Sequence, residues 1–118
     1  MKYYIVIPSY NEEALIGLTL QSLISQTILP SKIVVVNDNS TDRTAEVVLE
    51  FAKNNPYISL VNKSSENIHL PGSKVIQAFE KGFETLDDNY DLIVKIDADL
   101  IFPTNYFETI IKHFQSDE

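Results

Sequence analysis

Two aspartates, two positions apart, follow a run of apolar residues in the segment Leu92–Asp99, which reads LIVKIDAD. Leu92–Ile96 has the length and side-chain branching typical of a strand buried on both faces. Residues two apart in an extended chain point the same way, so Asp97 and Asp99 can face one spot. Convergent carboxylates at the carboxyl end of a parallel strand suit a hard divalent cation that also holds phosphates. From spacing alone, the competing interpretation, in which Asp97 caps the strand and Asp99 opens a turn, is favoured over a metal site.

Further residues with chemical potential stand at the ends of other predicted elements. Asp38 lies in an Asn-Asp-Asn-Ser run after a buried strand, where turn chemistry is the competing interpretation. Tyr10 follows the first strand, and its ring could stack on a base or pack against the protein. Lys74 begins a helix, where either a phosphate partner or plain solvation would explain a cation. Lys95 shares the parity of the two aspartates and could pair with an acid there.

The elements that must position these residues alternate along the chain. We expect strands at Tyr3–Pro8, Ile33–Val36, Tyr57–Val61 and Leu92–Ile96. We expect helices from Asn11 to Gln26, from Thr41 and Asp42 to Asn54, from Gly72 to Leu86, and from Pro103 onward. The alternation predicts an α/β fold, a Rossmann-like doubly wound parallel sheet with right-handed crossovers. With a strand order of 3-2-1-4, the segments that follow three of the strands, residues 8–12, 37–40 and 97–99, would line one crevice.

Size and composition are those of one globular domain spanning residues 1–118. Hydrophobic residues make up 44% of the chain, charged residues 22%, and the net charge is −8. The acidic balance argues against nucleic-acid partners and against electrostatic anchoring to anionic lipid. The absence of cysteine excludes disulfides and thiolate metal sites. We expect no transmembrane segment in this chain, a cytoplasmic location, and in the full protein a peripheral association with the inner face of the membrane.

Several enzyme classes are poor fits to the motifs. The three glycines form neither GxGxxG nor a Walker pattern, and no GxSxG elbow occurs. A phosphoacceptor receiver domain would need an acidic pair after the first strand, where Pro8-Ser9-Tyr10-Asn11 stands. A sugar-1-phosphate nucleotidyltransferase would need a glycine-rich loop at the same place.

Three segments taken in order resemble a known family: IPSYNEE with a helix ending SLISQT, then IVVVNDNSTDRT, then IDADL. Their order and spacing are similar to those of the nucleotide-binding half of family 2 glycosyltransferases, which have the GT-A fold, and the resemblance covers essentially the whole chain. It implies that Tyr10 lies along the base and that Asp38 bonds it. It also implies that the DxD aspartates bind the ribose and, through Mn²⁺ or Mg²⁺, the diphosphate. The nucleotide-binding residues implied are Pro8, Tyr10, Glu12, Asp38, Lys74 and Asp97, and the metal-binding residues are Asp99 and Asp97.

The resemblance further implies a metal-dependent, inverting transfer from a UDP-sugar to a saccharide or polyprenyl-linked acceptor. Two positions depart from the family pattern: Asn37 stands where an aspartate is common, and Glu80 where an asparagine often precedes the helix glycine. Family members continue into an acceptor half that carries the catalytic base. We therefore expect that this chain is a fragment of a longer enzyme and that no catalytic base lies within it. A homo-oligomer is also expected. The alternative is a non-catalytic nucleotide- or partner-binding domain of the same fold.

Overall fold

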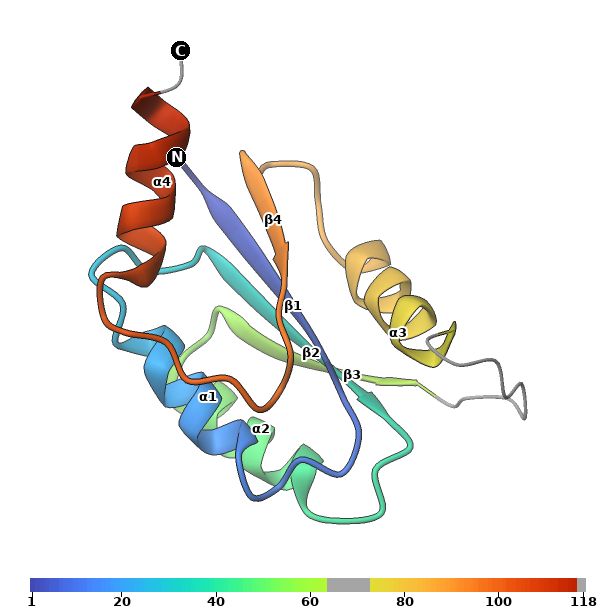
Figure 1. The fold of residues 1–118 in the computed structure, drawn as a ribbon. Coiled ribbons are helices and arrows are strands. Elements are labelled where there is room, and N and C mark those ends of the chain that lie inside the picture. Colours follow the sequence, from blue (N-terminus) through green and yellow to red (C-terminus); the bar gives the residue numbers. More distant parts are fainter. Residues whose placement is uncertain (64–72, 117–118) are drawn as a thin grey trace.

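The computed structural model describes residues 1–63 and 73–116 of the chain (Figure 1). Strands and helices alternate in the order β1 (Tyr3–Ser9), α1 (Ile16–Ile24), β2 (Lys32–Asp38), α2 (Thr44–Asn54), β3 (Ile58–Lys63), α3 (Ser73–Glu84), β4 (Leu92–Lys95) and α4 (Tyr106–Ser116). The four strands form one parallel sheet in the order β3-β2-β1-β4. Both the predicted fold class and the predicted strand order are confirmed.

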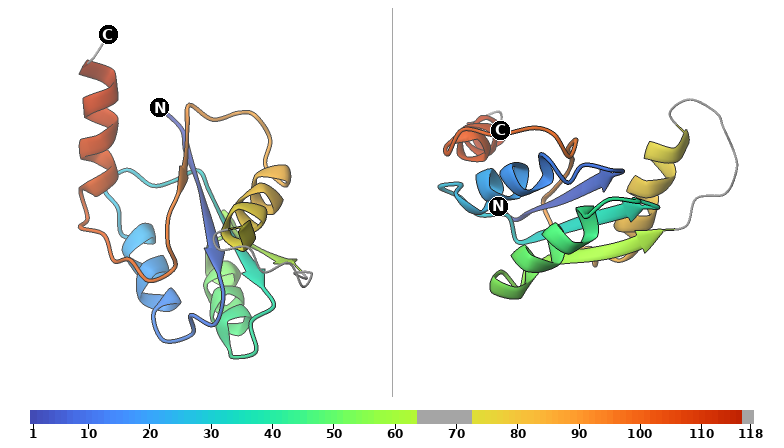
Figure 2. Two further views of the ribbon diagram at one scale, coloured as in Figure 1. Left: turned by 45° about the vertical axis from the view of Figure 1, so that its right-hand side comes forward. Right: turned by 90° about the horizontal axis from the view of Figure 1, so that it is seen from below.

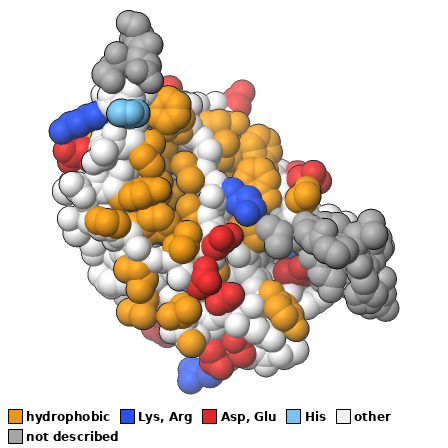
Figure 3. All heavy atoms as spheres, viewed as in Figure 1, with side chains coloured by type: hydrophobic (Ala, Val, Ile, Leu, Met, Phe, Trp, Pro, Cys, Tyr) orange, Lys and Arg blue, Asp and Glu red, His pale blue; other side chains and the backbone are white. Residues whose placement is uncertain are grey.

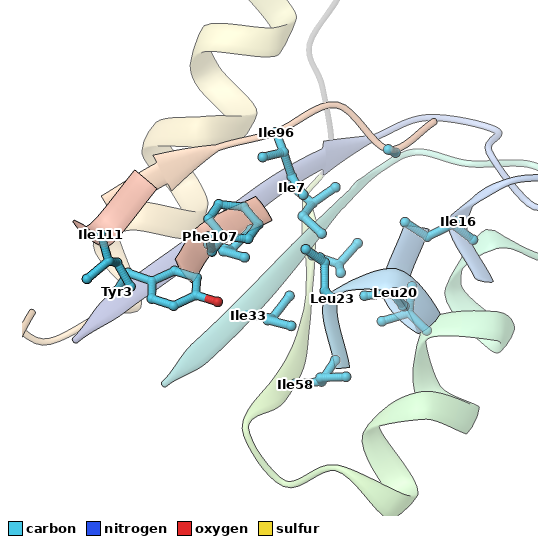
Figure 4. Packing of buried hydrophobic residues seen from close by; sticks show 14 residues of the cluster. Tyr3, Ile7, Ile16, Leu20, Leu23, Ile33, Ile58, Ile96, Phe107 and Ile111 are labelled. Atoms are coloured by element: carbon cyan, nitrogen blue, oxygen red, sulfur yellow. The ribbon is translucent and has the colours of Figure 1, made fainter. Parts of the chain in front are cut away.

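The helices cover both faces of the sheet, with α3 on one face and α1, α2 and α4 on the other (Figure 2). Successive strand residues point to opposite faces. On β1, Ile5 and Ile7 therefore pack toward α1, whereas Val6 packs toward α3. The larger cluster lies on the α1 face, and Figure 4 shows side chains of the sheet, α1 and α4 meeting there.

Close packing fixes α4 and α3 against the sheet. The rings of Tyr3 and Phe107 stack with their centroids 4.9 Å apart, and the Tyr3 hydroxyl donates to the Ile28 carbonyl. Burial raises the pKa of Tyr3, so the phenol stays neutral. On the other face, a Cβ added to Gly82 would lie 2.7 Å from Val36 Cγ2 and 2.8 Å from Val6 Cγ1. Glycine therefore allows α3 to approach the sheet at this position.

The first strands run further than the sequence predicted. β1 continues through Pro8 to Ser9, although Pro8 was expected to end it. The amide hydrogen that Pro8 lacks would point toward β4, as the Val6 carbonyl does. Because β4 pairs with β1 only as far as Val6 opposite Lys95, the proline removes no ladder bond. β2 includes Asn37 and Asp38, and β3 extends to Lys63, so these polar residues are held by the sheet.

β4 differs from the expected strand buried on both faces. Within the described part of the chain it is an edge strand, with Leu92, Ile93 and Val94 half-buried and Lys95 exposed. The strand ends at Lys95, one residue before the predicted Ile96. The run of apolar residues correctly predicted a strand. Its burial could not be predicted from that run, because burial depends on which elements lie next to the strand in the sheet.

The first helix begins later than the acidic residues after β1 suggested. α1 starts at Ile16 rather than near Asn11, and it ends at Ile24 rather than Gln26. Residues 11–13 instead bond across to the loop that follows β2 and to the first residue of α2. α2 and α4 likewise begin two to three residues after the predicted starts, whereas α3 is described from Ser73, and its predicted start near Gly72 lies outside the described residues. None of the helices in residues 1–63 and 73–116 is both long and apolar enough to cross a membrane.

Candidate functional site

The candidate site lies at the carboxyl ends of β1, β2 and β4, on the side of the sheet that α3 covers. Asp38 follows Val34 and Val36 in the strand alternation, and both valines pack toward α3. Beyond β4, Ile96 and Ala98 are buried in the opposite cluster, while Asp97 and Asp99 are exposed. The two aspartates therefore continue the direction of Lys95, away from the α1 face. A doubly wound sheet binds its ligands at this edge, next to the strand where the order reverses.

Two loops at this edge are joined by reciprocal hydrogen bonds. The Asn11 amide N–H donates to Ser40 Oγ at 3.0 Å, and the Thr41 amide N–H donates to Asn11 Oδ1 at 2.8 Å. The Glu12 amide N–H donates to Thr44 Oγ1 at 2.9 Å. Asn11 and Asn39 both have positive φ, 50° and 58°, a conformation that asparagine tolerates better than most residues. The two loops consequently form one rigid rim, which holds Tyr10 and Asp38 at fixed positions.

Tyr10 and Asp38 differ sharply in exposure on this rim. The Tyr10 side chain is 59% exposed, an unusual setting for an aromatic ring, and is available to a planar ligand. Pro8, two residues earlier, is half-buried in β1. The Asp38 side chain is only 9% exposed, and its Oδ1 lies 3.8 Å from Lys63 Nζ at the end of β3. The site thus combines an exposed ring with a largely buried carboxylate.

Asn37 has a structural role that explains the departure from the common aspartate. Its Nδ2 donates to Asn62 Oδ1 across the β2–β3 pair at 3.0 Å. Its Oδ1 accepts from the Ser40 amide at 3.2 Å, which starts the turn after β2. An amide can donate and accept at once, whereas an ionised carboxylate can only accept. Asn37 therefore ties the rim to β3, and the charged position is Asp38.

Acidic side chains gather just beyond β4, beside a basic side chain, in the middle of the face that Figure 3 shows. Lys95 Nζ lies 3.7 Å from Asp97 Oδ1, which confirms that Lys95 pairs with an acid here. Partial burial raises the pKa of Glu12, and the negative charges of Asp99, Asp42 and Asp97 raise it further. Among the described side chains of this region, the negative charge of Glu12, Asp97 and Asp99 exceeds what Lys95 can neutralise. Exposed oxygen donors with excess charge fit a hard divalent cation.

No three His, Cys, Asp or Glu side chains among the described residues lie close enough to hold a metal ion by themselves. A cation at Asp97 and Asp99 would accordingly complete its coordination with ligand or water oxygens, as Mg²⁺ commonly does beside phosphates.

The segment that carries the aspartates is anchored to α1. The buried Thr19 hydroxyl donates to the Ala98 carbonyl at 3.0 Å, between the two aspartates. Further along, Gln26 Nε2 donates to the Pro103 carbonyl at 2.6 Å, and the Phe107 amide donates to Gln26 Oε1 at 3.1 Å. These contacts fix the path of the chain from β4 to α4 (Figure 1).

The sequence predicted acids at the carboxyl edge of the sheet and did not predict the residues that contact them. Lys63, Thr19 and the cross-loop role of Asn11 were not foreseen, because each depends on which loop or strand lies opposite. The polar run after β2 was the available signal for the rim. Lys74 belongs to α3, but its side chain lies outside the described residues.

Comparison with known proteins gives a consistent result. The family profile described as Glycosyl transferase family 2 matches residues 4–118. The glycosyltransferase YibD of Escherichia coli (strain K12) is 32% identical over 110 residues, which are 93% of this chain and 29% of YibD. The chain thus spans less than a third of the length of that curated relative.

Solved structures agree with the sequence matches. S. aureus TarS 1-349 in complex with UDP-GlcNAc is similar at a TM-score of 0.71 and 25% identity, covering 98% of this chain and 32% of that one. The mannosyltransferase PcManGT of Pyrobaculum calidifontis, solved with GDP-Man and Mn²⁺, is similar at a TM-score of 0.67 and 25% identity, covering 86% of this chain and 28% of that one.

Proposed function

The chain belongs to glycosyltransferase family 2, and on that premise we propose that it is the domain that binds a UDP-sugar donor in a metal-dependent, inverting enzyme. The acceptor would be a saccharide or a polyprenyl-linked molecule. The observation that carries the proposal is that Tyr10, Asp38, Asp97 and Asp99 all lie at the carboxyl ends of β1, β2 and β4, which are neighbours in the sheet. The UDP-GlcNAc bound to TarS and the GDP-Man and Mn²⁺ bound to PcManGT support it.

The nucleoside would occupy the β1–β2 side of the site. The exposed Tyr10 ring offers a stacking surface for the base, and Pro8 stiffens the chain that leads to it. Asp38 would accept the imide N–H of uracil, which cytosine lacks at that ring position. Losing such a pairing costs roughly 1–3 kcal/mol, enough to favour UDP over CDP by about tenfold or more.

The diphosphate would lie on the β4 side. Asp97 would hold the ribose, and Asp99 and Asp97 would hold Mn²⁺ or Mg²⁺. Glu12, on the rim, would contribute to nucleotide binding. A bound divalent ion would neutralise charge that develops on the diphosphate leaving group. The residues of this chain would orient the sugar for in-line attack by an acceptor hydroxyl at the anomeric carbon, which inverts that centre. We place the base that deprotonates the hydroxyl outside this chain.

A binding titration tests the proposal. UDP should bind weakly in the presence of a chelator and more tightly with Mn²⁺, measured by calorimetry on the 118-residue chain. Asp99→Asn should remove most of that difference, whereas the matched change Asp88→Asn, in the turn after α3, should leave it intact. Equal affinity for UDP with Mn²⁺ and with chelator would eliminate the metal assignment. No UDP binding under either condition would favour the alternative of a partner-binding domain of this fold.

A further inference from the structure

Lys63, which the sequence pattern did not single out, lies beside Asp38, the acid proposed to bind the nucleobase. Lys63 and Asp38 face each other as register partners at the carboxyl ends of β3 and β2. Both side chains point to the α3 side, because Lys63 follows Val61, which packs there, by two residues. The Lys63 side chain is 13% exposed and that of Asp38 is 9% exposed. Charged side chains this little exposed require a partner.

The geometry of the pair leaves Lys63 able to donate elsewhere. Lys63 Nζ and Asp38 Oδ1 are 3.8 Å apart, which is an ion pair but longer than a hydrogen bond. An ammonium carries three donors, and a carboxylate accepts at up to four lone-pair positions. The strand register therefore sets a hydrogen-bond donor and a hydrogen-bond acceptor side by side on the base side of the site.

We propose that Lys63 is a specificity residue that donates to the base carbonyl next to the N–H that Asp38 accepts. The inference rests on the proposed function and deepens it: the Lys63–Asp38 pair reads an edge in which C=O and N–H are adjacent. Uracil presents O4 beside N3–H, and guanine presents O6 beside N1–H. Cytosine and adenine present an amino group beside a bare ring nitrogen, so both contacts would be reversed, with donor facing donor and acceptor facing acceptor.

The position of Lys63 in the sheet argues against a role at the diphosphate. In the order β3-β2-β1-β4, three inter-strand steps separate Lys63 from the strand that leads to Asp97 and Asp99. At 4.7–4.9 Å per step this is about 14 Å, beyond the reach of one lysine side chain. Lys63 thus acts at the base end of the nucleotide, on the same side as Asp38.

The test compares nucleotides on the wild-type chain and on Lys63→Met, which keeps an unbranched apolar side chain but removes the donor. Dissociation constants for UDP, CDP, GDP and ADP are measured by calorimetry with Mn²⁺. In the wild type, UDP or GDP should bind about tenfold or more tightly than CDP and ADP. The comparison of UDP with GDP identifies the base. Lys63→Met should weaken the preferred nucleotide about tenfold and change CDP far less. Lys63→Arg, which retains a donor, should keep the preference.

A modified nucleotide separates recognition from simple neutralisation of Asp38. 4-Thio-UDP keeps the N3–H but replaces O4 with a poor acceptor. Wild type should bind it several-fold more weakly than UDP, and Lys63→Met should bind the two equally. If Lys63 only neutralised Asp38, Lys63→Met would weaken the binding of all nucleotides and leave the ratio of the UDP and 4-thio-UDP affinities as it is in the wild type. Lys53→Met, on the exposed face of α2, is the matched control.

Two outcomes distinguish the inference from its premise. If the wild type binds no UDP or GDP with Mn²⁺, the proposed function fails and the inference fails with it. If the wild type binds UDP with Mn²⁺ and folded Lys63→Met keeps every nucleotide ratio, Lys63 does not read the base although the proposed function stands. Circular dichroism and thermal unfolding establish that the variant is folded.

Discussion

At the scale of single residues, the site carries more negative charge than the fold itself neutralises. Glu12 is partly buried, with Asp99, Asp42 and Asp97 close enough to raise its pKa above the ordinary 4.5. A carboxyl group with a raised pKa in the folded state binds its proton more tightly there than in the unfolded chain. Above its ordinary pKa the ionised group therefore opposes folding. An acidic residue at this position is therefore better explained by binding of a cationic ligand than by a contribution to the stability of the fold.

Glu12→Gln should raise the thermal unfolding temperature at pH 7 and change it little near pH 4 in the absence of metal. The gain should disappear at low pH because Glu12 is then largely protonated in both states. Glu84→Gln removes the same charge from the exposed end of α3 and controls for net charge. Differential scanning calorimetry at the two pH values measures the effect. A lower unfolding temperature for Glu12→Gln at pH 7 would contradict the electrostatic explanation.

At the scale of elements, α1 and α3 determine the shape of the candidate site through contacts that lie away from its acidic side chains. α1 holds the segment after β4 through Thr19, whose hydroxyl lies against the Ala98 carbonyl between the two aspartates. α3 approaches the sheet through Gly82 and covers the face on which Asp38 and Lys63 lie. Both contacts position the backbone and contribute no side chain that would bind a ligand.

Thr19→Val keeps the side-chain shape but leaves the buried Ala98 carbonyl without its donor. An unsatisfied buried acceptor should reduce the free energy of unfolding by about 1–3 kcal/mol. The metal-dependent part of UDP binding should fall more than the metal-independent part, because only the segment of the aspartates is released. Thr109→Val is the control, since that exposed hydroxyl donates to the Asn105 carbonyl within its own region of α4. Equal effects of the two variants on binding would contradict the anchoring role.

Gly82→Ala should destabilise the protein by about 1–3 kcal/mol in urea unfolding, because the new methyl group overlaps Val36 and Val6. The gain in helix propensity, about 1 kcal/mol, is too small to offset that overlap. Gly17→Ala provides the opposite case within α1. There the nearest atom to the added Cβ is Val47 Cγ1 at 3.5 Å, an ordinary contact, so stability should rise. Destabilisation by both substitutions would show that spacing against the sheet is not the cause.

At the scale of the whole molecule, the chain is a parallel four-stranded α/β domain of glycosyltransferase family 2 and spans less than a third of its curated relative YibD. Glu108 of α4 accepts from the Thr27 hydroxyl and pairs with Lys112 at 2.8 Å. The hydrogen bonds from Lys112 and Thr27 lower its pKa, which makes this carboxylate a weak base.

We expect the 118-residue chain to bind donor without transferring sugar, and a chain extended well past Glu118 to be active. The assay measures labelled sugar moving from a panel of UDP-sugars to saccharide and polyprenyl-linked acceptors, with both chains compared at equal concentration. Glu108→Gln in the extended chain should leave turnover largely unchanged. Turnover by the 118-residue chain would show that the catalytic base lies within it.

The segment after β4 exposes apolar side chains, which Figure 3 shows gathered over α4 and the chain leading to it. Leu100 and Ile101 are exposed, the latter by 60%. Large exposed patches favour association, so sedimentation should detect dimers at high concentration. Ile101→Lys should reduce them, whereas Leu49→Lys, on exposed α2, should not. A monomer at all concentrations would contradict the expected homo-oligomer.

The sequence by itself determined the parallel fold, its strand order and the acids at its edge. Buried strands, amphipathic helices and polar exits are local patterns, and the alternation of strand and helix constrains topology strongly. Asp38, Asp97 and Asp99 could be named because each follows a recognisable apolar run.

Only the tertiary structure decided which residues stand opposite these acids. Lys63 became relevant through the register of β3 on β2, and Thr19 through the packing of α1 under the segment after β4. The start of α1 was displaced because Asn11 bonds to the loop after β2, and Glu12 to the first residue of α2, instead of entering a helix. Such contacts join residues from 25 positions apart, for Asp38 and Lys63, to 79 positions apart, for Thr19 and Ala98. Local propensity contains no information about those pairings, since they arise only when the sheet has assembled.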